Sequence, residues 1–169
     1  MATTSKIAPC LWFNGTAVDA ARIYTSIFPN SHIGQVQRAA ADNPSVAKED
    51  VLTVEFTLDG RDFIGLNGGP DFTFNEAVSF VVDCADQDEV DRYWDALLEG
   101  GGEPSVCGWL KDRFGLSWQV VPHRMQEMYA SPDRAAAERA MNAMLTMTKL
   151  DIAELEAAFA GKVPADATR

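Results

Sequence analysis

The sequence predicts an α+β fold built from two similar halves, each ordered strand, helix, strand, strand, strand, with helices added at the C-terminus. Two capping-box signatures point to the repeat: Thr16 precedes Asp19, and Asp86 precedes Glu89, each at the start of an amphipathic helical stripe. Placing Thr16 on Asp86 aligns the two stripes, and short strand-like segments follow both of them. A hairpin signal at residues 59–60 supports the strand order of the first half.

The first half covers about residues 6–70. Its helix carries apolar residues at helical spacing up to Phe28 and ends at Pro29. Residues 51–58 alternate between apolar and polar side chains, as in a strand with one buried face. The Asp59-Gly60 pair then turns the chain back, because both central positions of a type I′ turn need positive φ. We therefore expect strands over residues 7–13, 32–38, 51–58 and 61–66.

The second half, about residues 74–122, repeats this order. Its helix begins after Asp86 and ends at three glycines, residues 100–102. We expect its strands over residues 77–83, 106–111 and 116–121. Residues 1–122 would then form one paired domain, with residues 123–161 as a helical extension packed on it and residues 162–169 as a tail. Within the extension, Asp151 and Glu154 form a third capping box.

Composition narrows the classes of function. The 169 residues include 14 Lys and Arg against 25 Asp and Glu, a formal net charge of −11, without a basic cluster for nucleic acid or an anionic membrane. No apolar run is long enough to span a bilayer, and the N-terminus lacks the apolar stretch of a secretory signal. Cys10, Cys84 and Cys107 are odd in number and widely spaced, which disfavours a disulfide framework and favours the cytoplasm.

Several segments rich in Trp and Gly resemble one known group of proteins. They span nearly the whole chain up to Gly161 and are residues 9–15 (PCLWFNG), 63–70 (FIGLNGGP), 74–80 (FNEAVSF), 107–122 (CGWLKDRFGLSWQVVP) and 149–152 (KLDI). The chain resembles the vicinal-oxygen-chelate superfamily of glyoxalase I, bleomycin-resistance proteins and extradiol dioxygenases. Within it, the chain is most similar to the PhnB-like branch labelled 3-demethylubiquinone-9 3-methyltransferase. The resemblance implies an incomplete barrel-like sheet made by two βαβββ modules, with clefts for ligands, and a homodimer.

The resemblance also implies where a metal would lie. Metal-dependent members hold a divalent ion with His, Glu or sometimes Gln from four strands, and the corresponding positions here fall near Pro9, Gly65, Ala77 or Val78, and Gln119. Only Gln119 offers a donor, whereas such an ion needs several anionic or imidazole ligands. The two histidines, His32 and His123, lie outside these positions. We therefore expect no catalytic metal and no other cofactor.

Enzymatic alternatives stay open, the first being a glyoxalase or dioxygenase type with metal ligands elsewhere. The methyltransferase label would call for a Gly-rich turn between a strand and a helix, and residues 68–70 (GGP) follow a strand without preceding a helix. Cys107 could act as a nucleophile if Lys111 lowers its pKa, although an inert buried cysteine is the more frequent situation. Glu55, on an alternating strand, is a further candidate.

A small-molecule pocket is the function that the residues favour. Aromatic and polar side chains on or beside the predicted strands are the candidate ligand-binding residues, namely Trp12, Glu55, Asn67, Phe74, Trp109, Lys111, Trp118 and Gln119. A mostly apolar cavity with a few polar groups is typical of such sites, although each aromatic residue could instead fill the core or a dimer interface. We predict a PhnB-like protein that binds a small, partly apolar molecule, and we assign no catalytic residue.

Overall fold

The computed structural model describes residues 6–162 of the chain. The chain divides into two compact units between Phe74 and Asn75, and each unit has its own four-stranded sheet. Over the described residues, no helix is both long and apolar enough to cross a lipid bilayer. Residues 163–169, most of the predicted tail, lie outside the described part.

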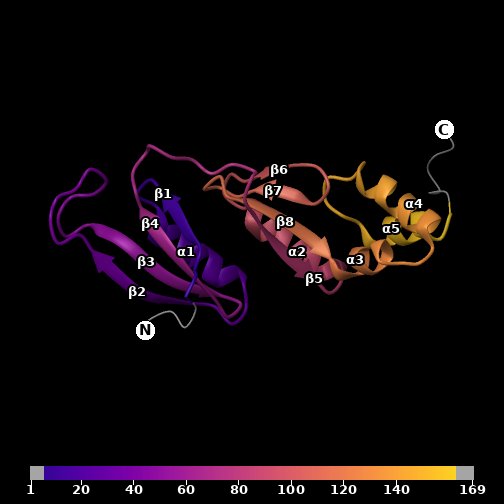
Figure 1. The fold of residues 1–169 in the computed structure, drawn as a ribbon, viewed down its shortest axis with the longest axis horizontal. Coiled ribbons are helices and arrows are strands. Elements are labelled where there is room, and N and C mark those ends of the chain that lie inside the picture. Colours follow the sequence, from indigo (N-terminus) through magenta and orange to yellow (C-terminus); the bar gives the residue numbers. More distant parts are fainter. Residues whose placement is uncertain (1–5, 163–169) are drawn as a thin grey trace. The chain divides into compact units, whose positions relative to one another are not determined.

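In the first unit, one helix packs on one face of the sheet (Figure 1). The strand order is β1-β4-β3-β2, with β1 parallel to β4 and the other neighbours antiparallel. The elements are β1 (Cys10–Phe13), α1 (Ala17–Ile27), β2 (His32–Arg38), β3 (Val51–Leu58) and β4 (Arg61–Asn67). The predicted hairpin is confirmed, since Asp59 and Gly60 have φ angles of 45° and 75°. The first strand is shorter than predicted and begins at Cys10.

Alternation along β3 and β4 determines which side chains meet α1. Val54 and Phe56 are buried, and the Phe56 ring lies 6.3 Å from the Tyr24 ring of α1, measured between centroids. Gly65 lets the helix approach the sheet, because a Cβ there would lie 3.0 Å from Val54 Cγ1 and 3.2 Å from Ala17 Cβ. The face away from α1 carries half-buried side chains, including Trp12, Glu55, Ile64 and Leu66.

The second unit repeats this topology. Its strand order is β5-β8-β7-β6, again with the first strand parallel to the last and the other neighbours antiparallel. Its elements are β5 (Ser79–Cys84), α2 (Gln87–Leu98), β6 (Glu103–Pro104), β7 (Trp109–Lys111) and β8 (Ser117–Pro122). Buried side chains of α2 pack on one face of this sheet. The predicted α+β class and the two βαβββ modules are therefore confirmed.

Three helices extend the second unit beyond its sheet. Cys107 N donates to Met147 O at 2.7 Å, and Gly108 N donates to Thr148 O at 2.8 Å. Residues 147–148, which follow the second of these helices, are therefore bonded to residues 107–108, which precede β7. Leu150 is fully buried, and a Cβ on Gly108 would lie 2.9 Å from its Cδ1 atom. These helices are α3 (His123–Tyr129), α4 (Arg134–Met144) and α5 (Ile152–Phe159).

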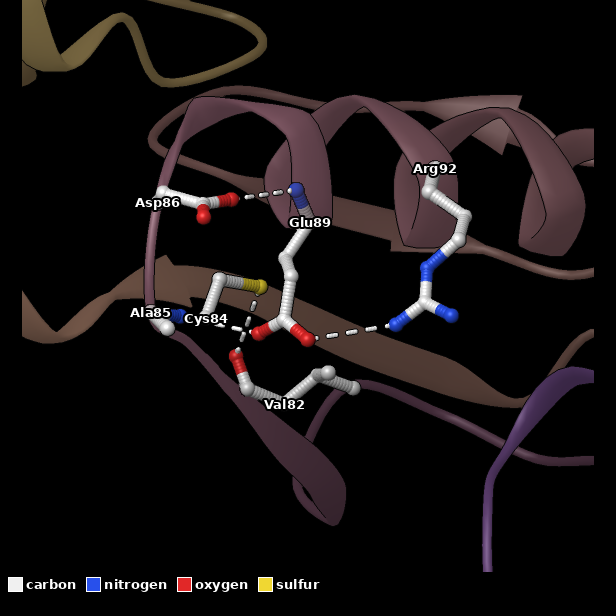
Figure 2. A network of polar contacts seen from close by, with 6 residues as sticks. All are labelled: Val82, Cys84, Ala85, Asp86, Glu89 and Arg92. Atoms are coloured by element: carbon white, nitrogen blue, oxygen red, sulfur yellow. Dashed lines mark hydrogen bonds and ion pairs between the residues drawn. The ribbon is translucent and has the colours of Figure 1, made fainter.

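Helix α2 begins at the capping box that the sequence predicted (Figure 2). Asp86 Oδ1 accepts a hydrogen bond from Glu89 N at 2.9 Å, and Glu89 Oε2 accepts one from Ala85 N at 2.9 Å. Asp86 thus satisfies a backbone N–H group that the first helical turn leaves without a partner, while Glu89 bonds the residue before the N-cap. At α5, Asp151 Oδ1 accepts from Glu154 N at 2.9 Å in the same manner.

The capping box predicted at Thr16 is wrong. The Thr16 side chain makes no capping hydrogen bond, although Thr16 does occupy the N-cap position of α1. Asn67, at the end of β4, supplies the acceptor instead. Its Oδ1 accepts from Ala17 N at 2.9 Å, while its Nδ2 donates to Val51 O at 2.9 Å. A buried amide from the sheet therefore replaces the local side chain at the start of the helix.

The strand predicted over residues 106–111 is also shorter than expected. It begins only at Trp109, because Cys107 and Gly108 adopt positive φ angles of 61° and 80° and form a turn. In that turn, Trp109 N donates to Val106 O at 3.1 Å. The chain before it forms β6, a two-residue strand that sequence periodicity could not reveal.

Candidate small-molecule site

The face of the second sheet away from α2, here termed the open face, carries a continuous row of polar side chains. Strand register pairs Glu103 of β6 with Lys111 of β7, Lys111 with Ser117 of β8, and Ser117 with Ser79 of β5. Side chains paired in this way point to the same face of a sheet. One acid, one ammonium group and two hydroxyls therefore lie side by side across four strands.

A second row on the open face lies next to the first. Register pairs Trp109 with Gln119 and Gln119 with Val81. The Trp109 indole is half-buried, and Val81 is 57% exposed. Gln119 Nε2 donates to Ser79 Oγ at 2.9 Å, which links the two rows.

A depression of about 480 Å³ lies over one end of these rows. Its lining combines apolar and polar groups and consists of Glu76, Glu103, Pro104, Ser105, Val106, Cys107, Trp109, Leu110, Lys111 and Ser117. The turn at Cys107 forms one wall, so the positive φ angles there shape the site directly. Every lining residue belongs to the second unit, so this depression is complete within one compact part of the chain.

Ser117 is the most informative residue of the lining. Its side chain is fully buried, and its Oγ has no hydrogen-bond partner. Among the described residues, Tyr129 Oη is the other buried side-chain atom in this situation. A buried hydroxyl without a partner costs about 1–3 kcal/mol, so a group that binds it regains that free energy. The lining of the depression thus includes a polar group whose hydrogen-bonding capacity is unused in the structure.

Lys111 is paired within the site. Its Nζ lies 2.5 Å from Glu76 Oε1, and both side chains are partly or largely exposed. Hydrogen bonding to the Glu76 carboxylate raises the pKa of Lys111, and the charges of Glu76 and Glu103 act in the same direction. The hydrogen bond from Lys111 likewise lowers the pKa of Glu76. Both partners are therefore charged at neutral pH.

Two of the predicted site residues are used within the fold. Asn67 is buried and bonded to Ala17 and Val51, as described above. Trp118 is 3% exposed, and its Nε1 donates to Asp112 Oδ2 at 2.9 Å. Both side chains lie on the helix-covered faces of their sheets, because neighbouring residues of a strand point to opposite faces.

Besides Asn67, three predicted site residues lie in the first unit. Trp12 Nε1 donates to Gly69 O at 2.9 Å, and the Trp12 ring packs edge-on against Phe72. Phe74 packs edge-on against Phe13, with ring centroids 5.4 Å apart. Glu55 is half-buried on the face of the first sheet away from α1. Of the eight predicted residues, the structure brings Trp109, Lys111 and Gln119 together on one face.

Sequence reasoning missed Ser117, Glu76 and Glu103 as site residues. Ser117 gave a usable signal, since it is two residues from Gln119 in a strand and must share its face. Glu76 lies in a loop and Glu103 in a two-residue strand, so neither position has a periodicity that predicts where it points.

The strand positions that correspond to superfamily metal ligands do not fit a divalent ion. Gly65 faces α1, and the other faces of β1 and β4 carry Trp12 and Leu66. The corresponding strands of the second unit, β5 and β8, carry the neutral side chains Ser79 and Gln119. These are poor ligands compared with imidazole or carboxylate groups. Over the described residues, no three His, Cys, Asp or Glu side chains cluster so that they could hold a metal ion.

Comparison with known proteins agrees with the paired modules. The sequence profile of the 3-demethylubiquinone-9 3-methyltransferase family matches residues 5–121. A solved structure from Bacillus cereus, a PhnB protein provisionally described as a 3-demethylubiquinone-9 3-methyltransferase, is 31% identical with a TM-score of 0.62, covering 70% of this chain and 99% of its own. A search among curated proteins gave no match.

Two more distant structures share the fold. A Pseudomonas aeruginosa protein is 21% identical with a TM-score of 0.52, covering 70% of this chain and 98% of its own. Fosfomycin resistance protein FosX from Mesorhizobium loti is 11% identical with a TM-score of 0.53, covering 76% and 98% of the two chains.

The repeated βαβββ topology and these similarities define a protein of the vicinal-oxygen-chelate superfamily. Within it, the chain belongs to the 3-demethylubiquinone-9 3-methyltransferase family, the PhnB-like branch. The resemblance inferred from the sequence is therefore confirmed. The family match ends at residue 121, so helices α3 to α5 follow the matched region.

Proposed function

We propose that this protein binds a small, partly apolar molecule in the depression on the open face of the second sheet, without a catalytic metal. The observation that carries the proposal is the buried Ser117 hydroxyl without a partner, in a depression that also has the Trp109 indole in its lining. A volume of about 480 Å³ falls within the roughly 300–1,000 Å³ range of small-molecule pockets. Apolar surface with a few fixed polar groups is the usual lining of such pockets.

The lining residues contribute to binding in different ways. Trp109 and Val106 offer apolar area to the body of a ligand, and Val106 is 61% exposed. Ser117 and Lys111 offer hydrogen bonds that fix its orientation. Gln119, next to Trp109 in the register, is held by its bond to Ser79 and extends the polar surface beyond the depression.

The experiment is a titration with 2-phenylethanol, an uncharged probe with a ring and one hydroxyl, followed by ¹⁵N–¹H NMR. We expect amide shifts concentrated in residues 105–111 and at Ser117. Trp109→Leu should weaken binding several-fold because the indole supplies contact area. Phe72→Leu removes an exposed aromatic ring from the first unit and should leave the affinity unchanged. Shifts that avoid residues 105–117, or equal effects of the two variants, would contradict the proposal.

The metal-free part of the proposal has its own test. Native mass spectrometry before and after incubation with Zn²⁺, Mn²⁺, Ni²⁺ or Fe²⁺ should show no stoichiometric uptake, because Gln119, the donor among the superfamily ligand positions, is a neutral side chain. Uptake of one ion per chain would favour a metal-dependent glyoxalase or dioxygenase type instead. Loss of that ion in a Gln119→Ala variant, with retention in Gln87→Ala, would identify Gln119 as a ligand.

The two glycine-rich segments, residues 68–70 and 100–102, have structural roles in this fold. A Cβ on Gly68 would lie 2.2 Å from a ring carbon of Trp12, so glycine is needed for packing there. The glycines after α2 end that helix, and a Cβ on Gly102 would lie 2.7 Å from Leu98 Cα. Neither segment links a strand to the N-terminus of a helix, the arrangement that binds S-adenosylmethionine in the common fold.

A further inference from the structure

The charges around the depression restrict the ligand. Glu76 and Glu103 line it together with Lys111, so two carboxylates face one ammonium group. Lys111 is already bonded to Glu76, and Glu103 lies opposite Lys111 in the register of β6 and β7. The ionised lining therefore carries one net negative charge, within a chain whose formal net charge is −11.

We propose that the ligand is an organic ammonium ion: a small molecule with an apolar, preferably aromatic body and one protonated amine. This inference rests on the proposed function and names the chemical class that the same site accepts. The amine donates to Ser117 Oγ, which is buried and has no partner, while Glu103 and Glu76 supply the compensating charge. The apolar body lies against Trp109 and Val106.

Ser117 fits this ligand because a hydroxyl oxygen offers two acceptor lone pairs. Next to it, Lys111 carries a like charge, but Glu76, bonded to it at 2.5 Å, neutralises that charge and limits its repulsion of the bound ammonium group. Trp109 adds a further attraction, because the face of an indole binds cations through its quadrupole. The apolar part of the lining and its negative charge thus act on two different parts of one molecule.

A carboxylate ligand fits the same site less well. To reach Lys111 it would have to displace Glu76, whose oxygen lies 2.5 Å from the Lys111 ammonium group, and it would then lie beside Glu103. The carboxylate of the ligand and that of Glu103 would then repel each other, even in a high-dielectric environment. An uncharged ligand would keep the apolar contacts but gain nothing from the two carboxylates.

Three probes of nearly equal size and different charge test the inference: 2-phenylethylammonium, 2-phenylethanol and 3-phenylpropanoate. Their dissociation constants are measured by ¹⁵N–¹H NMR at neutral pH and low salt, from the shifts of residues 105–111. We expect the ammonium probe to bind about fivefold more tightly than the alcohol, and the carboxylate most weakly. Higher ionic strength should reduce the preference for the ammonium probe.

Variants test which residues cause the preference for the ammonium probe. Glu103→Gln should remove most of the advantage of the ammonium probe over the alcohol, whereas Glu99→Gln, an exposed site outside the lining, should alter neither affinity. Ser117→Ala should weaken the ammonium probe more than Ser79→Ala does.

Equal binding of the ammonium and alcohol probes, or tighter binding of the carboxylate, would overturn the inference while leaving a small-molecule site in place. Absence of shifts in residues 105–117 with all three probes would overturn the proposed function together with it.

Discussion

Asn67 joins three parts of the first unit through one side chain. Its amide accepts from Ala17 N and donates to Val51 O, and the residue is 5% exposed. Asn67→Ala leaves both backbone groups without a partner and should lower the free energy of unfolding by about 2–3 kcal/mol, measured by urea denaturation. Asn75→Ala is the matched control, since Asn75 is exposed and bonds only locally to Ala77 N. Equal losses in both variants would contradict the role given to Asn67.

We expect Cys84 to make the free energy of unfolding depend on pH. Burial, followed by the charges of Glu89 and Asp83, raises the pKa of its thiol from 9.0 to about 12. The folded protein thus keeps the thiol protonated where the unfolded chain ionises it, so its contribution to stability is full below pH 9 and is lost as pH rises toward 12. The free energy of unfolding should fall less steeply over this range in Cys84→Ala than in the unmodified protein or Cys107→Ala. Parallel slopes in all three proteins would contradict this assignment.

Residue identity predicted part of the site and missed part of it. Trp109, Lys111 and Gln119 are predicted as ligand-binding residues, and they share one sheet face. Trp118 could not share it, because it is adjacent to Gln119 in the same strand and must point to α2. The missing partner of Ser117 depends on the positions of all its neighbours, so no sequence pattern reports it.

Two helices with similar N-terminal sequences differ in how they begin. Asp86 caps α2 through Glu89 N, whereas the Thr16 side chain makes no cap in α1. Asp86→Ala should therefore cost about 1 kcal/mol in the free energy of unfolding. Thr16→Ala should stay within about 0.5 kcal/mol, as for a surface change, in the same denaturation assay. A cost at Thr16 as large as that at Asp86 would mean that its hydroxyl does contribute a cap.

Element order and type were readable from the sequence where the signals were local. The Asp59-Gly60 turn, the alternation over residues 51–58 and the cap at Asp86 each act within a few residues. The start of α1 depends on Asn67, which lies far away in the sequence, and β6 is too short to show a period. Long-range hydrogen bonds and very short strands therefore account for the main errors.

At the scale of the whole molecule, two sheets of identical topology differ in the elements that surround them. In the second unit, the turn that forms one wall of the depression is bonded to the segment around Met147, beyond the part of the chain that matches the family. The C-terminal extension thereby holds Cys107 and Gly108 beside the site. The homodimer implied by the resemblance stays a prediction, for which the oligomeric state in solution is the measurement.

The most direct test of the proposed binding site is to observe a probe in the depression by intermolecular nuclear Overhauser effects. With 2-phenylethanol bound, we expect contacts from its ring protons to the Trp109 indole and the Val106 methyl groups, with its hydroxyl end toward Ser117. Contacts confined to the first unit or to α3–α5, with none to Trp109 or Val106, would contradict the claim that this depression is the binding site.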